Sequence, residues 1–131
     1  DLPVTIALFT DTDLQKRARK IARVGGVKNF TDEQLQYFMQ NLPAEFARYD
    51  AQQTSDYLAL NAGLVAMNLV LALTDQGIGT NIILGFDKSK INEVLDIEER
   101  FRPEVLITVG YAAEKVEPSY RLPVDEIIDK R

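Results

Sequence analysis

The chain has 131 residues, of which 46% are hydrophobic, and a formal net charge of −5, values that are typical of a single globular domain. It contains no cysteine and no histidine, which excludes disulfides, thiolate catalysis, cysteine-ligated metals and the Ser-His-Asp scheme. The acidic balance argues against a nucleic-acid partner, because phosphate binding needs a basic face. No basic stretch followed by an apolar segment opens the sequence, so we expect no signal peptide and a cytoplasmic location.

The first 26 residues predict a strand and a helix. Residues 3–9, PVTIALF, form a short β-branched and aromatic run, which is typical of a buried strand. Thr12 or Asp13 can cap a short helix that runs to about Arg23 and is broken by the glycine pair of residues 25–26. Because the chain begins in β-prone residues without a methionine, we expect upstream sequence in the natural protein.

A capping box opens the next predicted helix. Thr31 and Gln34 have the spacing at which each side chain caps the backbone of the other residue. An apolar stripe that includes Phe38 follows and is expected in the core. Pro43 interrupts or kinks this helix before residues 44–49, AEFARY, resume it.

The longest apolar run, residues 58–73, predicts a central helix. Only Asn61 and Asn68 are polar in it, so the helix should be buried on nearly every side. The two amides are seven residues apart and lie on one face, where burial would require a polar seam or a subunit contact. We reject a membrane span, because the run is slightly too short and would place both amides in lipid.

The second half of the chain alternates short elements. Gly77 supplies a C-terminal cap for the central helix, and residues 80–84, TNIIL, predict a strand. A brief helix over 87–97 precedes the clearest strand, 104–111, and an extended tail over 115–131 follows. Three apolar side chains of the brief helix are expected to point inward: Ile91, Val94 and Leu95.

Two motifs suggest chemistry that other features disfavour. Gly77, Gly79 and Gly85 could suggest a nucleotide loop, but the order here is helix, glycines, strand, whereas a dinucleotide-binding turn runs from strand to glycines to helix. Asp11 and Asp13 resemble a metal-binding acidic pair, but they lie between a strand and a helix, where aspartate is favoured as a cap. A metal site is therefore not predicted.

Two other groups are candidates for a binding site. Phe46 and Tyr49 follow the proline and are free to reach a pocket. Arg121 lies in the apolar, proline-bounded segment PSYRLPV, two residues after Ser119. Its guanidinium suits a phosphate, although an arginine in a tail is more often part of a surface ion pair.

Several segments, in this order, resemble the nitroreductase family of FMN-dependent oxidoreductases. They are NAGLVAMNLVLALTDQGIGT (61–80), NIILGF (81–86), EVLITVGY (104–111) and the late RLP (121–123). The opening DLPVTIALFTDTD is also similar to a major strand of the family. The resemblance covers the later two-thirds of the family's domain and implies that residues 1–131 are one domain lacking its N-terminal part.

This resemblance implies an α+β fold, with a mixed, mainly antiparallel sheet flanked by helices around a central buried helix. It also implies an FMN site in which backbone groups lie against one face of the flavin ring. Gly85 would let the backbone approach the ring closely. Leu84 stands where some members have an acidic residue, and Ser119 where some have lysine. The expected cofactor-binding residues are Ile82, Ile83, Leu84, Gly85, Ser119 and Arg121, and Phe46 and Tyr49 are expected to line the acceptor pocket.

The function that the resemblance implies is NAD(P)H-dependent reduction of nitroaromatics, quinones or similar electron-poor compounds. Hydride is expected to pass from the nicotinamide to FMN and then to the acceptor, so no catalytic side chain and no metal are expected. The family is homodimeric, with flavin at the subunit interface, and no membrane partner is implied. The alternative is a non-catalytic flavin-binding or dimerising module of the same fold.

Overall fold

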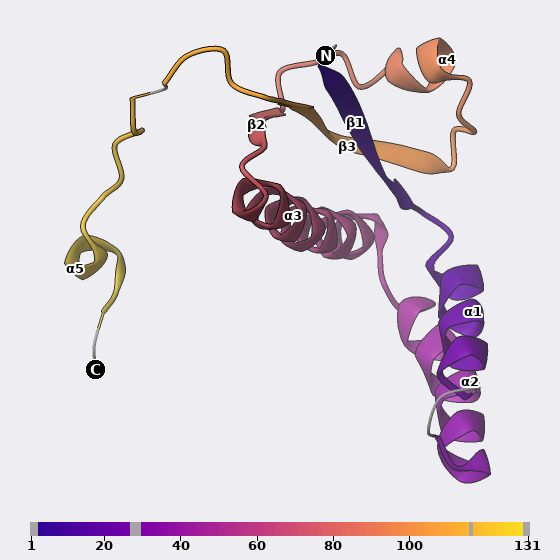
Figure 1. Ribbon diagram of the computed structural model, residues 1–131. Helices are drawn as coiled ribbons and strands as arrows, with labels where there is room; N and C mark the ends of the chain where they lie inside the picture. The colour runs from indigo at the N-terminus through magenta and orange to yellow at the C-terminus, as the bar shows by residue number, and fades with distance from the viewer. Residues whose placement is uncertain (1–2, 27–29, 116, 130–131) are drawn as a thin grey trace.

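The computed structural model describes residues 3–26, 30–115 and 117–129. Figure 1 shows a small sheet crossed by one long helix, with a helical pair at one end and a tail at the other. The elements, in chain order, are β1 (Val4–Asp11), α1 (Leu14–Gly26), α2 (Asp32–Phe46), α3 (Ala51–Asp75), β2 (Gly79–Ile83), α4 (Ile91–Leu95), β3 (Phe101–Gly110) and α5 (Val124–Ile127).

The sheet is centred on β3. Its strand order is β1-β3-β2, and both pairings are antiparallel, so within the described ranges the sheet is antiparallel and not mixed. Ile107 of β3 pairs with Ile6 of β1 and with Ile82 of β2. Because alternate residues of a strand face opposite sides of the sheet, these three side chains lie on one face. Ile107 is fully buried there.

Helix α3 covers that face of the sheet (Figure 1). Ala66 of α3 packs with Val105 and Ile107 of β3 in the buried core. Partly buried apolar residues surround this cluster, among them Leu8 and Leu69. The small alanine side chain lets the helix approach the sheet closely, so the contact depends on Ala66 as much as on the larger residues.

The outer side of α3 is exposed, which contradicts the prediction of burial on nearly every side. Asn61 and Asn68 are both exposed, and Asn61 donates from Nδ2 to the Tyr57 carbonyl at 2.7 Å. No buried polar seam is therefore needed. One exposed stripe of α3 remains apolar and consists of Leu60, Gly63, Leu64, Met67 and Leu71.

By length and composition alone, α3 is apolar enough to cross a membrane. A single helix of this kind is weak evidence for a span, because the core helix of a soluble protein has the same composition. Helix α3 is apolar on two sides, and each side needs a surface to cover it. The sheet covers one of them.

The predicted helix ends are largely confirmed. Thr31 and Gln34 form the expected capping box of α2, and Asp50 forms a second one at the start of α3. At the end of α3, the Gly77 N–H donates to the Thr74 carbonyl and the Ile78 N–H to the Leu73 carbonyl. Gly77 has a φ of 73°, which glycine adopts without steric cost.

Two local predictions differ from the structure, and a third is confirmed in part. Helix α1 continues beyond Arg23 through the glycine pair to Gly26. Helix α2 is not interrupted at Pro43, but residues 44–46 continue it as predicted. In α4, Val94 is 73% exposed and Leu95 is 44% exposed, so neither points into a core as predicted. The helix is only five residues long and has too little contact with the sheet to bury them.

Glu104 of β3 is the buried acidic residue of the described ranges. Its Oε1 accepts from Thr10 Oγ1 of β1 at 2.6 Å and from Arg102 Nε at 2.7 Å. Arg102 in turn donates from Nη1 to Ser55 Oγ at 2.8 Å and from Nη2 to the Ser55 carbonyl at 3.0 Å. This network ties both strands to the first turns of α3.

We expect Glu104→Ala to lower the free energy of unfolding by about 2 kcal/mol, because Arg102 and Thr10 lose a buried charged partner. Urea unfolding followed by circular dichroism measures this change. The control is Glu98→Ala, which removes an ion pair to Arg100 whose acidic side chain is 74% exposed. It should cost under about 0.5 kcal/mol, and equal losses in the two variants would contradict the prediction.

Candidate functional site

The predicted ring-contact segment, residues 82–85, begins inside β2 and ends just beyond it. Strand β2 is an edge strand, so one row of its backbone N–H and C=O groups has no partner strand. Ile82 faces the α3 side of the sheet with 42% of its surface exposed, and Leu84 is 67% exposed. The segment thus offers backbone groups and apolar surface, and no charged group.

The described residues give no steric reason for glycine at the end of this segment. A Cβ atom added at Gly85 would meet no atom within 4 Å, and Gly85 does not have the positive φ that Gly77 has. By contrast, a Cβ at Gly79 would lie 3.1 Å from the Gly110 carbonyl oxygen. Gly79 is needed for strand packing, whereas the backbone at Gly85 is open to another molecule.

Ser119 and Arg121 lie on the irregular segment between β3 and α5, and both are exposed. Figure 1 shows this segment running away from the sheet. Arg121 donates from Nη1 to the neighbouring Tyr120 carbonyl at 2.9 Å. Among the described residues it has no carboxylate partner, so the surface ion pair considered from the sequence is not formed. Its guanidinium is available to an external anion.

Phe46 and Tyr49 are brought together at the end of α2. Their ring centroids are 5.5 Å apart in an edge-on contact, and Tyr57 of α3 lies 5.1 Å from Phe46 and 6.0 Å from Tyr49. These rings pack partly on one another, in the edge-on and tilted contacts that aromatic rings favour. Sequence reasoning missed Tyr57, which lies directly before the apolar run of residues 58–73.

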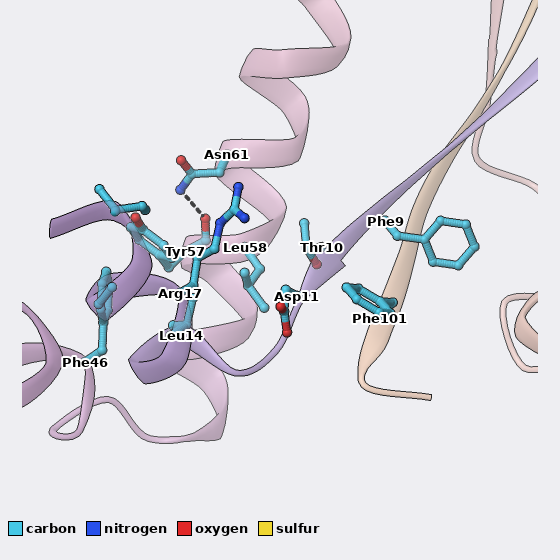
Figure 2. Close-up of a pocket in the computed structure, with 12 residues that line it drawn as sticks. Phe9, Thr10, Asp11, Leu14, Arg17, Phe46, Tyr57, Leu58, Asn61 and Phe101 are labelled. Carbon is cyan, nitrogen blue, oxygen red and sulfur yellow. Dashed lines mark hydrogen bonds between the residues drawn. The ribbon is translucent and has the colours of Figure 1, made fainter. Parts of the chain in front are cut away.

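Phe46 lines a pocket of about 400 Å³ where α1, the end of β1 and the first turns of α3 meet (Figure 2). Phe101 and Tyr57 add aromatic surface, and Arg17 and Asp11 add charge. Figure 2 shows Arg17 rising from α1 beside Tyr57 and Asn61. The pocket has the size and the mixed lining of small-molecule sites.

The predicted site residues therefore occupy three separate places in one chain. Residues 82–85 lie at the sheet edge, Arg121 lies in the tail, and Phe46 lies beside α1. The pocket that Phe46 lines contains no residue of segment 82–85 and does not contain Arg121. The family resemblance indicated which residues belong to the site. It did not indicate whether a single chain brings them together.

The turn after the ring-contact segment is held by Asp87. Its Oδ1 accepts from Ser89 Oγ at 2.6 Å and from the Ser89 N–H at 3.0 Å. These hydrogen bonds, with Lys90 nearby, hold the pKa of the Asp87 carboxyl below its usual value. The group stays ionised at neutral pH, where it caps the turn, and this cap weakens only as the pH falls through the lowered pKa.

Known structures share this fold. A nitroreductase family protein from Streptococcus pneumoniae is 86% identical and superposes with a TM-score of 0.90, over 97% of this chain and 64% of that one. A protein of Exiguobacterium sibiricum crystallised with FMN is 27% identical, with a TM-score of 0.87 over 97% of this chain and 61% of that one. The predicted fold family is thereby confirmed.

Sequence comparison agrees. The Streptococcus pyogenes protein named "Putative NAD(P)H nitroreductase Spy0809" is 64% identical over 126 residues, which are 96% of this chain and 62% of that protein. The chain thus spans about three fifths of the length of these relatives. A sequence model of the nitroreductase family matches residues 4–111. The chain belongs to the nitroreductase family.

Proposed function

We propose that the protein is an FMN-dependent oxidoreductase that uses NAD(P)H to reduce nitroaromatics, quinones or similar electron-poor acceptors. Family membership supports this, as do a relative named for NAD(P)H nitroreductase activity and a neighbouring structure that contains FMN. Because the chain spans about three fifths of those relatives, the proposal concerns the protein in its full length.

The observation that carries the proposal is the open backbone at Gly85. The chain itself gives no reason for glycine there, yet a flat ring lying on residues 82–85 would need the space that a Cβ occupies. The β-branched Ile82 and Ile83 stiffen the strand on which the ring would rest. The bound flavin supplies the redox chemistry, and the chain supplies binding and orientation.

The phosphate of the cofactor would be held by Arg121, whose guanidinium has no acidic partner in the described ranges. Two parallel N–H groups of a guanidinium match a phosphate in geometry and charge. Ser119, two residues earlier and also exposed, would add a hydroxyl donor. Phe46 and Tyr49 are proposed to line the acceptor pocket, where aromatic rings suit flat, electron-poor substrates.

A homodimer is part of the proposal. The exposed stripe of α3 is apolar over three turns, and a second copy of the same helix would cover it by self-complementary packing. Gly63 lies in this stripe with no atom within 4 Å of an added Cβ, which leaves room for a close helix contact. A partner copy would also explain why residues 82–85, Arg121 and Phe46 lie apart in one chain.

FMN retention tests the cofactor site. We expect the full-length protein to keep yellow flavin absorbance after excess FMN is removed. Gly85→Ala should weaken binding about tenfold, the effect of roughly 1.4 kcal/mol, while changing the free energy of unfolding by under about 0.5 kcal/mol. Gly79→Ala should instead lower stability, because its Cβ approaches the Gly110 carbonyl at 3.1 Å.

Arg121→Ala should also weaken FMN binding about tenfold, because a charge-assisted phosphate contact is lost. Lys115→Ala removes the same charge from the same exposed tail and should leave FMN affinity unchanged. If Gly85→Ala and Arg121→Ala both retain FMN as the wild type does, the assignment of these residues to the FMN site is refuted. If the full-length protein retains no flavin at all, the flavoenzyme proposal fails and the dimerising module replaces it.

Sedimentation tests the dimer. We expect the protein to sediment as a dimer and Leu64→Glu to convert it to a monomer, because a charge would be buried between the two α3 helices. The chain should stay folded, since Leu64 is 64% exposed in one copy. Val94→Glu is the control: Val94 is 73% exposed on α4, and its variant should remain dimeric. A wild-type monomer would contradict this prediction.

A further inference from the structure

Helix α1 carries the opposite charge to the rest of the protein. Between Leu14 and Gly26 it has no acidic residue, while the chain outside it has ten cations and twenty acids. Its five basic residues are all exposed, and we call them the cation face: Lys16, Arg17, Arg19, Lys20 and Arg23. A protein with a net negative charge therefore has a concentrated positive surface on α1.

No acid in the described ranges neutralises the cation face. None of its side chains lies within 4.0 Å of a carboxylate oxygen, and none donates a hydrogen bond to a neighbouring group. Lys16 and Lys20 are four residues apart, and Arg17 and Lys20 are three apart, so like charges are adjacent on the helix surface. Such pairs destabilise a helix, which indicates that an external anion accounts for them.

Arg17 connects the cation face to the pocket of Phe46 and Tyr57. It lines the pocket with them, and Figure 2 shows its guanidinium beside Tyr57. Asp11 is the acidic residue that also lines the pocket, and its Oδ1 accepts the Asp13 N–H at 3.1 Å. A ligand with its flat part among the rings would place an attached anion against Arg17, and Lys20 follows Arg17 by three residues on the same helix.

We propose that Arg17 and Lys20 form the subsite for the 2′-phosphate of the reductant, so that the protein prefers NADPH to NADH. This inference rests on the proposed function, and it adds that the nicotinamide nucleotide occupies the acceptor pocket before the acceptor does. The two nucleotides differ by one phosphate monoester, which carries a charge of about −1.5 to −2 near pH 7. Adjacent cations without acidic partners suit that group, whereas a single cation would suffice for a carboxylate.

The test measures binding of adenosine 2′,5′-bisphosphate and of adenosine 5′-monophosphate by calorimetry on the flavin-free chain. The two probes differ only in the 2′-phosphate. We expect the bisphosphate to bind at least about tenfold more tightly, and the preference to shrink at high salt as exposed charges are screened. The double variant Arg17→Ala, Lys20→Ala should bind the two probes to within about threefold.

Lys88→Ala is the control, because it removes an exposed positive charge at α4 and should keep the preference. Circular dichroism checks that all variants fold. Equal binding of the two probes by the wild-type chain would overturn the proposal, as would an equal loss in Lys88→Ala. Binding of phosphatidylglycerol vesicles or of single-stranded RNA through Arg17 and Lys20, without the bisphosphate preference, would overturn it in favour of a macromolecular polyanion.

This result is separable from the FMN proposal. The probes are measured without flavin, and the Arg17 and Lys20 variants are expected to retain FMN as the wild type does. Bisphosphate preference without FMN retention would refute the flavoenzyme proposal and leave the phosphate subsite standing. FMN retention without the preference would refute the subsite alone.

Discussion

The buried carboxylate of Glu104 joins three parts of the chain that must lie together. It accepts from Thr10 of β1 and from Arg102, which donates onward to Ser55 at the start of α3. A buried acid costs free energy unless it is paired and hydrogen-bonded, so this network strongly favours one placement of α3 across the sheet. With α3 placed, the turn at Gly77 returns the chain along the free side of β3 and creates the edge strand β2.

The position of β2 explains why the candidate cofactor segment contains no charged group. An edge strand keeps one row of backbone groups free, and in the proposed site these groups would bind a flat ring without side-chain acids or bases. The cost is an edge open to other chains, which β2 limits by its length of five residues. Gly79 and Gly85 then divide two tasks: the first allows close packing inside the sheet, and the second leaves the surface open.

Local signals in the sequence predicted local structure well. The Thr31 box, the Gly77 cap and strand β3 follow from residue types at fixed spacings, and all three are observed. The exposed side of α3 could not be predicted. The composition of an apolar helix indicates how much apolar surface must be covered, but it does not indicate which molecule covers it. Arg102 and Ser55 are 47 residues apart, so no spacing rule could pair them. The charge of α1 was readable from its composition and was overlooked.

Residues of the chain fall into two classes: those whose burial or hydrogen bonds within the chain account for them, and those that such contacts do not explain. Ile107 is buried and Glu104 is hydrogen-bonded, so folding alone accounts for both. Gly85, Arg121 and the cation face of α1 are not accounted for in this way, since each leaves space or charge unused. Selection for stability would remove such features, because like charges and unneeded glycines weaken a fold. The proposed ligand sites rest on these features, which are observed independently of any resemblance.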